Sequence, residues 1–329
     1  MLGRANAGMR SARSAIRKSK DIRCIHEGRV GLKFWQSVHG VEPEQLIEVA
    51  RSADELGYTG ITFGDHLVKP ASYAKNYLYS EDGRPPWDPE DPDWTPPYAD
   101  PWILSAVLAQ ATQRLRFMPY VYVLPLREPV TVAKQLATAA FFAGDRVVLG
   151  VGAGWLEEEF DLVGADWSSR GQRLDEMLEI IALLLSGRDV EFKGRHYEIP
   201  PCRMRPVPSR PVPVMVGGHS DIALRRAAKA DGWLGVDYEL DDLAVLLRKL
   251  RGYRRELGRD TEPFEVFAVL KQFPDLDTLR RMADLGITMT QDYAWFYKGQ
   301  PVSTPEHKRA TMERFAEETI RHWDEIDGR

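Results

Sequence analysis

The strongest constraint on the fold of this 329-residue chain is a repeat in which short apolar segments alternate with amphipathic ones. The strand-like segments cover residues 30–35, 60–63, 115–123, 146–151, 212–216, 232–236, 264–269 and 286–290. The helix-like segments cover residues 43–56, 101–112, 129–142, 170–185, 221–230, 242–257, 276–285 and 305–324. Apolar strands that are each followed by an amphipathic helix are typical of a parallel sheet covered by helices.

Eight units of this kind predict a (β/α)8 barrel, the α/β fold in which a parallel sheet closes on itself. A doubly wound open sheet is the alternative that the pattern leaves open. Helix punctuation agrees with the count. Thr304 and Pro305 are typical of an N-cap and a first helical turn, while Gly57 and Gly187 stand where helices should end. We therefore expect one barrel domain over residues 30–329.

The charge is distributed unevenly along the chain. Residues 1–29 carry eight basic and two acidic side chains, a net charge of +6, so the rest carries −11 of the total of −5. This segment lacks apolar periodicity and is expected to be a flexible arm, with contact to nucleic acid or to an acidic surface as the alternative. The acidic body argues against a nucleic-acid partner, because such proteins need a broad basic face.

Composition also limits where in the cell the protein is expected. No run of about 18 apolar residues is present, and the basic N-terminus lacks the apolar stretch of a secretory signal. We expect no membrane association and a cytoplasmic location. Cys24 and Cys202 are too few for a disulfide framework, and no cysteine or histidine spacing is typical of zinc, so no metal is expected.

Two insertions interrupt the repeat. Residues 69–102, between the second strand and the second helix, hold eight of the 22 prolines and seven aromatic residues. Loops of this length in compact domains are typical of lids, and packing on a neighbouring subunit is the alternative. The candidate lid residues toward a substrate are Tyr73, Tyr77, Trp87 and Trp94. Residues 190–199 are expected to form a β-hairpin outside the barrel.

The second strand ends in the first candidate catalytic group. Barrel enzymes place their working residues at the C-terminal ends of strands, and here Asp65 and His66 follow Gly64. A histidine at this place is suited to giving or taking a proton near neutral pH, with Asp65 orienting it or capping a turn. A structural histidine is the alternative.

Glycines follow the fourth strand. Gly152 and Gly154 would let the backbone approach a flat ligand, because no Cβ intervenes. The alternative is a tight turn into a helix whose acidic residues 157–159 complement the helix dipole.

A second glycine turn follows the fifth strand. Gly217, Gly218, His219 and Ser220 open a helix, where free backbone N–H groups and a hydroxyl are suited to a phosphate. An ordinary capped turn is the alternative.

Taken together, three segments resemble a known family. They are ELGYTGITFGDHLV, YVYVLPLREPVTVAKQLATAAFFAGDRVVLGVGAGWLEEEF and PVPVMVGGHSDIALRRAAKADGWLG. They are similar to the bacterial luciferase-like monooxygenase superfamily, and most of all to its branch that depends on the deazaflavin coenzyme F420. The resemblance spans residues 30 to about 325 and implies a (β/α)8 barrel with the cofactor ring across its C-terminal mouth.

The resemblance also implies roles for individual residues. Asp65 and His66 match an aspartate-histidine pair in which the histidine stands near the reactive ring carbon. Val121 and Tyr122 fall where the family carries a bulge with a cis non-proline peptide behind the ring.

Gly217, Gly218 and His219 match a phosphate-binding turn. Trp155 departs from the pattern, because the sugar-phosphate dehydrogenase of this family has a glutamate there. That departure puts sugar-phosphate oxidation in doubt.

The resulting functional expectation is hydride transfer with coenzyme F420 to or from a small apolar or ring-bearing substrate. Reduced FMN acting with O2 as a monooxygenase is the second choice, and a flavin-binding barrel without catalysis is the third. The resemblance further implies a homodimer or higher homo-oligomer.

Overall fold

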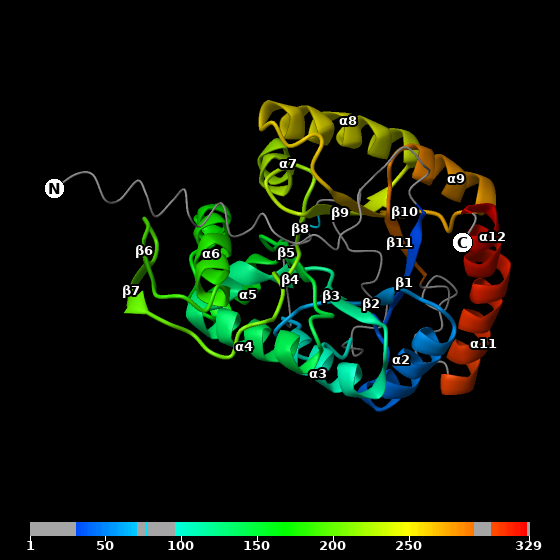
Figure 1. The fold of residues 1–329 in the computed structure, drawn as a ribbon, viewed down its shortest axis with the longest axis horizontal. Helices are drawn as coiled ribbons and strands as arrows, with labels where there is room; N and C mark the ends of the chain where they lie inside the picture. Colours follow the sequence, from blue (N-terminus) through cyan, green and yellow to red (C-terminus); the bar gives the residue numbers. More distant parts are fainter. Residues whose placement is uncertain (1–30, 71–76, 78–95, 293–303, 328–329) are drawn as a thin grey trace.

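A computed structural model describes residues 31–70, 77, 96–292 and 304–327 of the chain (Figure 1). The expected basic arm over residues 1–29 lies outside these ranges, as do the candidate lid residues Tyr73, Trp87 and Trp94. Of the four lid candidates, Tyr77 is described, and its side chain is buried.

Nine described strands form one parallel sheet in the order β3-β2-β1-β11-β10-β9-β8-β5-β4. Their bounds are β1 (Lys33–Ser37), β2 (Gly60–Phe63), β3 (Arg116–Pro119), β4 (Tyr122–Val123), β5 (Leu149–Gly152), β8 (Val214–Gly217), β9 (Gly232–Tyr238), β10 (Glu265–Leu270) and β11 (Met289–Asp292). A parallel bridge between Phe117 of β3 and Val147, two residues before β5, joins the two sides of this order. The sheet is therefore nearly closed, which confirms the predicted barrel and makes the open-sheet alternative wrong.

Helices surround the sheet on its outer face (Figure 1). They are η1 (Pro43–Gln45), α2 (Leu46–Glu55), α3 (Pro101–Ala111), η2 (Leu124–Leu126), α4 (Pro129–Phe142), α5 (Glu157–Leu162), α6 (Arg170–Leu185), α7 (Asp221–Ala227), α8 (Leu240–Glu256), α9 (Leu276–Asp284), α11 (Pro305–Phe315), the π-helical η3 (Ala316–Ile320) and α12 (Arg321–Asp327). Thr304 caps α11 as predicted, accepting a hydrogen bond from the N–H of His307. Within the described ranges, no helix is long and apolar enough to cross a membrane.

The predicted third strand, and the ends of two other strands, differ from the observed ones. The expected third strand, residues 115–123, is divided into β3 and β4 by a cis peptide bond between Tyr120 and Val121. β5 and β8 each end one residue later than predicted, at Gly152 and Gly217. A glycine interrupts the run of apolar side chains by which a strand is predicted. Pairing between strands uses only backbone groups, however, so Gly152 and Gly217 still pair with neighbouring strands.

Two layers of apolar side chains hold the barrel together. Trp35, Met118, Met215, Leu234 and Phe267 belong to a cluster contributed by strands around the ring. A larger cluster packs the outward-facing strand residues against the helices. Each large side chain buried in this way contributes about 1.5–3 kcal/mol of transfer free energy.

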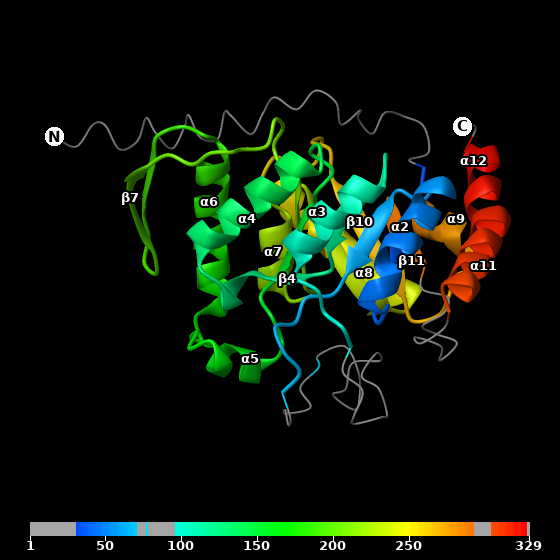
Figure 2. The ribbon, with the colours of Figure 1, turned by 90° about the horizontal axis from the view of Figure 1, so that it is seen from below.

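A hairpin projects from the barrel beside α6 (Figure 1). β6 (Val190–Lys193) pairs antiparallel with β7 (Glu198–Cys202), which confirms the predicted hairpin. α5 begins at Glu157, where the alternative interpretation of Gly152 and Gly154 placed a helix that the eight-unit repeat did not count. It lies at the end of the barrel where the chain leaves β2 (Figure 2).

Candidate active site

Most of the predicted site residues lie at one end of the barrel. The parallel strands place their C-terminal ends together, so the residues that follow β2, β5 and β8 share a rim. Val121 connects two of these strand ends. A Cβ atom added to Gly152 would lie 2.5 Å from Val121 Cγ2, and one added to Gly217 would lie 3.0 Å from Val121 Cγ1. The two glycines therefore make room for the Val121 side chain.

Gly154 has a related packing role. Its φ of +88° is unfavourable for other residues, and an added Cβ would lie 2.7 Å from Val123 Cγ1 and 2.9 Å from the Phe160 ring. The observed role of Gly152 and Gly154 is thus to let the chain pack closely, and direct contact with a ligand stays a prediction.

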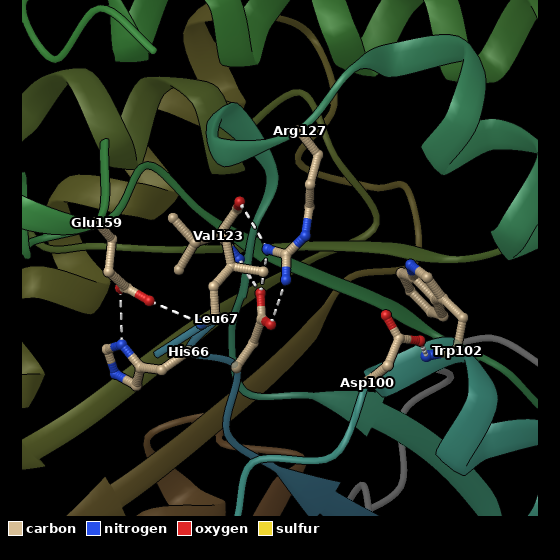
Figure 3. A network of polar contacts seen from close by, with 8 residues as sticks. His66, Leu67, Asp100, Trp102, Val123, Arg127 and Glu159 are labelled. Carbon is tan, nitrogen blue, oxygen red and sulfur yellow. Dashed lines mark hydrogen bonds and ion pairs between the residues drawn. The ribbon is translucent and has the colours of Figure 1, made fainter. Parts of the chain in front are cut away.

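His66 is held by a carboxylate from another part of the chain. Its Nδ1 atom lies 2.8 Å from Glu159 Oε2, and the N–H of Leu67 donates to Glu159 Oε1 at 2.7 Å (Figure 3). The His66 side chain is 14% exposed and that of Glu159 is 2% exposed. Glu159 belongs to the first turn of α5, which brings it to the residues that follow β2.

Asp65 has different partners from those expected. Its two carboxylate oxygens accept hydrogen bonds from Arg127 Nη1 and Nη2, each at 2.7 Å, and Oδ2 also accepts from the N–H of Val123 at 2.8 Å (Figure 3). The expectation that Asp65 orients His66 or caps a turn is therefore corrected. The carboxylate that hydrogen-bonds the imidazole is that of Glu159, whereas Asp65 ties the end of β2 to β4.

The ion pair of Asp65 and Arg127 is buried. Burial raises the pKa of Asp65, and the charge and hydrogen bonds of Arg127 together with the Val123 N–H oppose that rise. The Arg127 guanidinium also lies over the Tyr122 ring, 4.2 Å from its centroid. Tyr122 is fully buried against Trp102, in the cluster of side chains between the sheet and the helices. Its ring therefore packs against Arg127 from that side.

Aromatic rings surround the imidazole of His66. The rings of Tyr98 and Trp155 lie edge to face with it, at centroid distances of 5.0 and 6.0 Å. Tyr77 packs on Trp155 at 5.4 Å. The Tyr98 ring also lies close to Gly64, because a Cβ atom added to this glycine would be 2.8 Å from the ring.

A second histidine, His39, lies on the other side of Tyr98, with ring centroids 5.5 Å apart. Burial, together with the charge of His66, lowers the pKa of His39 to about 4. His39 is therefore neutral at pH 7 and leaves His66 as the imidazole of this cluster suited to proton transfer.

The predicted phosphate turn follows β8. Gly218 has a φ of +117°, and its carbonyl accepts a hydrogen bond from Trp233 Nε1 at 2.8 Å. Ser220 caps α7 by accepting from the N–H of Ala223 at 3.2 Å, which leaves its hydroxyl hydrogen as a donor. Burial lowers the pKa of His219. Capping and phosphate binding are thus compatible at this turn.

Sequence reasoning missed Glu159, Arg127 and His39. Glu159 carries a local signal, because it shares one helix face with the buried residues Leu156 and Phe160. Arg127 and His39 carry none, since their roles depend on contacts with residues far away in the sequence. Among the residues that the structure describes, no group of three or more histidine, cysteine or carboxylate side chains is arranged to hold a metal ion.

Comparisons with known proteins agree with the barrel fold. The family model described as luciferase-like monooxygenase matches residues 32–327. An uncharacterised protein of Mycobacterium tuberculosis is 37% identical over 276 residues, which cover 83% of this chain and 94% of the relative. An F420-dependent glucose-6-phosphate dehydrogenase of Amycolatopsis mediterranei is 28% identical over 211 residues, covering 63% of this chain and 56% of that protein.

A solved structure supports the fold. The crystal structure of monooxygenase RslO1 from Streptomyces bottropensis matches 89% of this chain and 100% of its own, with a TM-score of 0.68 and 18% identity. The family match and the F420-dependent relative support an oxidoreductase. The chain belongs to the luciferase-like monooxygenase family.

Proposed function

We propose that this protein catalyses hydride transfer with coenzyme F420, to or from a small apolar or ring-bearing substrate. The observation that carries the proposal is the imidazole of His66, held by a buried carboxylate and enclosed by aromatic rings at the rim of the barrel. Coenzyme F420 is the first choice of cofactor because a relative that matches over 211 residues is named as F420-dependent.

The residues present fit a flat, phosphorylated cofactor. Val121 is packed against Gly152 and Gly217, and its side chain would support one face of the cofactor ring. The turn from Gly217 to Ser220, with His219, would bind the phosphate through backbone N–H groups and the Ser220 hydroxyl. When bound, the deazaflavin would supply the carbon that carries the hydride. His66 would give or take the accompanying proton.

A binding titration tests the choice of cofactor. Purified protein is mixed with F420 and, separately, with FMN, and quenching of cofactor fluorescence is followed. Tighter binding of F420 supports the proposal. Binding of FMN with none of F420 would contradict it and favour the monooxygenase alternative that uses reduced FMN and O2.

The rings beside His66 support an apolar or ring-bearing substrate. We expect Trp155→Ala to raise KM for ring-bearing alcohols about tenfold or more, because an aromatic contact with the substrate ring would be lost, and to lower kcat less than His66→Ala does, because Glu159 still holds the imidazole. F420 reduction with 1-phenylethanol as the probe, and glucose 6-phosphate as the comparison, measures this change. An unchanged KM for the ring-bearing probe, or a wild-type preference for the sugar phosphate, would contradict the assignment.

We also propose that the protein forms a homodimer through α3 and α4. These neighbouring helices expose the side chains of Ile103, Val107, Phe141 and Phe142, which are between 45% and 67% accessible. Contiguous exposed apolar side chains of this kind are typical of protein interfaces. The interface would be self-complementary.

Replacing Phe141 and Phe142 with glutamate is therefore expected to convert dimers into monomers. Light scattering on a size-exclusion column measures the molar mass. Ile222→Glu is the matched control, because Ile222 is 72% exposed on a different helix, α7. A wild-type protein that is monomeric, or a double variant that stays dimeric, would overturn this proposal.

A further inference from the structure

The carboxylate of Glu159 is buried and both of its oxygens are used. Oε2 lies 2.8 Å from His66 Nδ1, and Oε1 accepts from the N–H of Leu67 at 2.7 Å. Among the ion pairs of the described residues, its partner is His66 alone. Burying a carboxylate is costly unless it is paired, so this arrangement requires a specific compensating group.

We propose that Glu159 is a positioning residue that sets the tautomer of His66 and leaves Nε2 as its proton acceptor. This inference rests on the proposed role of His66. An ionised carboxylate only accepts hydrogen bonds, so the His66 nitrogen that faces it must carry a hydrogen. The neutral imidazole then keeps its lone pair on Nε2.

The surroundings of the ring reinforce this assignment. Tyr98 and Trp155 pack against the imidazole, and Glu159 binds Nδ1, which restricts rotation of the ring. Asp65 does not compete for the imidazole, because its oxygens are bound to Arg127 and Val123. When His66 gains a proton at Nε2, the buried Glu159 carboxylate stabilises the resulting imidazolium.

The bond to Leu67 makes the prediction for a glutamine variant unusually specific. In Glu159→Gln, the amide oxygen must face the N–H of Leu67, because an NH2 group there would oppose another donor. The NH2 group is then directed at His66 Nδ1, which must become an acceptor. The substitution should therefore move the hydrogen of His66 from Nδ1 to Nε2.

Nitrogen-15 NMR of histidine-labelled, cofactor-free protein tests the proposal when the pH is raised until the His66 ring is neutral, since two-bond couplings then distinguish the two tautomers. The His66→Gln variant assigns the signal. The wild type should show the Nδ1–H tautomer and Glu159→Gln the Nε2–H tautomer. Glu157→Gln, which removes the same charge from an exposed residue in the same helical turn, should resemble the wild type.

Turnover provides the second readout. Glu159→Gln should lower kcat by about 10²–10⁴-fold, and Glu157→Gln should leave it unchanged. A wild-type Nε2–H tautomer, or a glutamine variant that keeps Nδ1–H, would overturn the proposal. If Glu159→Gln does not fold, the wild-type spectrum alone tests the proposal. Because the spectrum needs no cofactor, a failed F420 titration would refute the proposed function without affecting this result.

Discussion

Replacing His66 with alanine is expected to lower F420-dependent turnover by about 10²–10⁴-fold, the usual contribution of a positioned acid or base. The His66 side chain is enclosed by Tyr98 and Trp155, bound by Glu159 and 14% exposed. The Nδ1 edge of the ring is therefore occupied, and little of the side chain is accessible. A water molecule in the space left by alanine would lack both the fixed position of the imidazole and its ability to give or take a proton.

The same variant separates an enzyme from a barrel that only binds a flavin. The affinity for F420, measured by fluorescence quenching, should change little, because the residues proposed to bind the cofactor lie just before β4, at the end of β5 and in the turn after β8. Loss of turnover with retained binding supports catalysis. Turnover that equals that of the wild type would refute the role of His66, and no turnover in either protein would favour the non-catalytic alternative.

The second large effect concerns stability. Asp65→Asn should lower the free energy of unfolding by about 3–5 kcal/mol, because it leaves the Arg127 guanidinium buried without its counter-charge. The Asp65 side chain is 2% exposed and that of Arg127 is 15% exposed. The amide of asparagine has one oxygen in place of two acceptors, so it cannot receive both guanidinium bonds and the bond from the Val123 N–H.

Denaturant unfolding measures this change, and the chain offers a matched control. Asp189 also binds an arginine, Arg203, through two hydrogen bonds, at 2.9 and 2.5 Å, but both side chains are more than half exposed. Asp189→Asn should change stability little, since solvent screens such pairs. Equal effects of the two substitutions would contradict the assignment of Asp65 as a buried structural anchor.

Much of the fold was predictable because its determinants are local. Alternation of apolar and amphipathic segments records which faces are buried, and the bounds of α4 and α6 agree with the prediction. The division of the predicted third strand into β3 and β4 was harder to predict from the sequence. The Val121 side chain, which follows the break, packs against Gly152 and Gly217, and both glycines are distant in the sequence.

The placement of the candidate residues in the fold was predictable, and their contacts were less so. Strand ends indicated His66 and the glycine turns, because a parallel barrel gathers those ends on one rim. The partners of Asp65 and His66 were not predictable from spacing. Two carboxylates were available near His66, and the fold assigned the adjacent one to Arg127 and the one 93 residues away to the imidazole. Such choices are made by tertiary packing.

The central claim is that one flat, phosphorylated cofactor contacts both the rim near His66 and the turn after β8. A crystal structure of the complex with F420 tests it most directly. The account predicts the deazaflavin ring against Val121, the phosphate at the N–H groups of Gly218 and His219, and the Nε2 edge of His66 facing the substrate position beside the ring. A cofactor bound away from Val121, or with its phosphate elsewhere than at this turn, would contradict it.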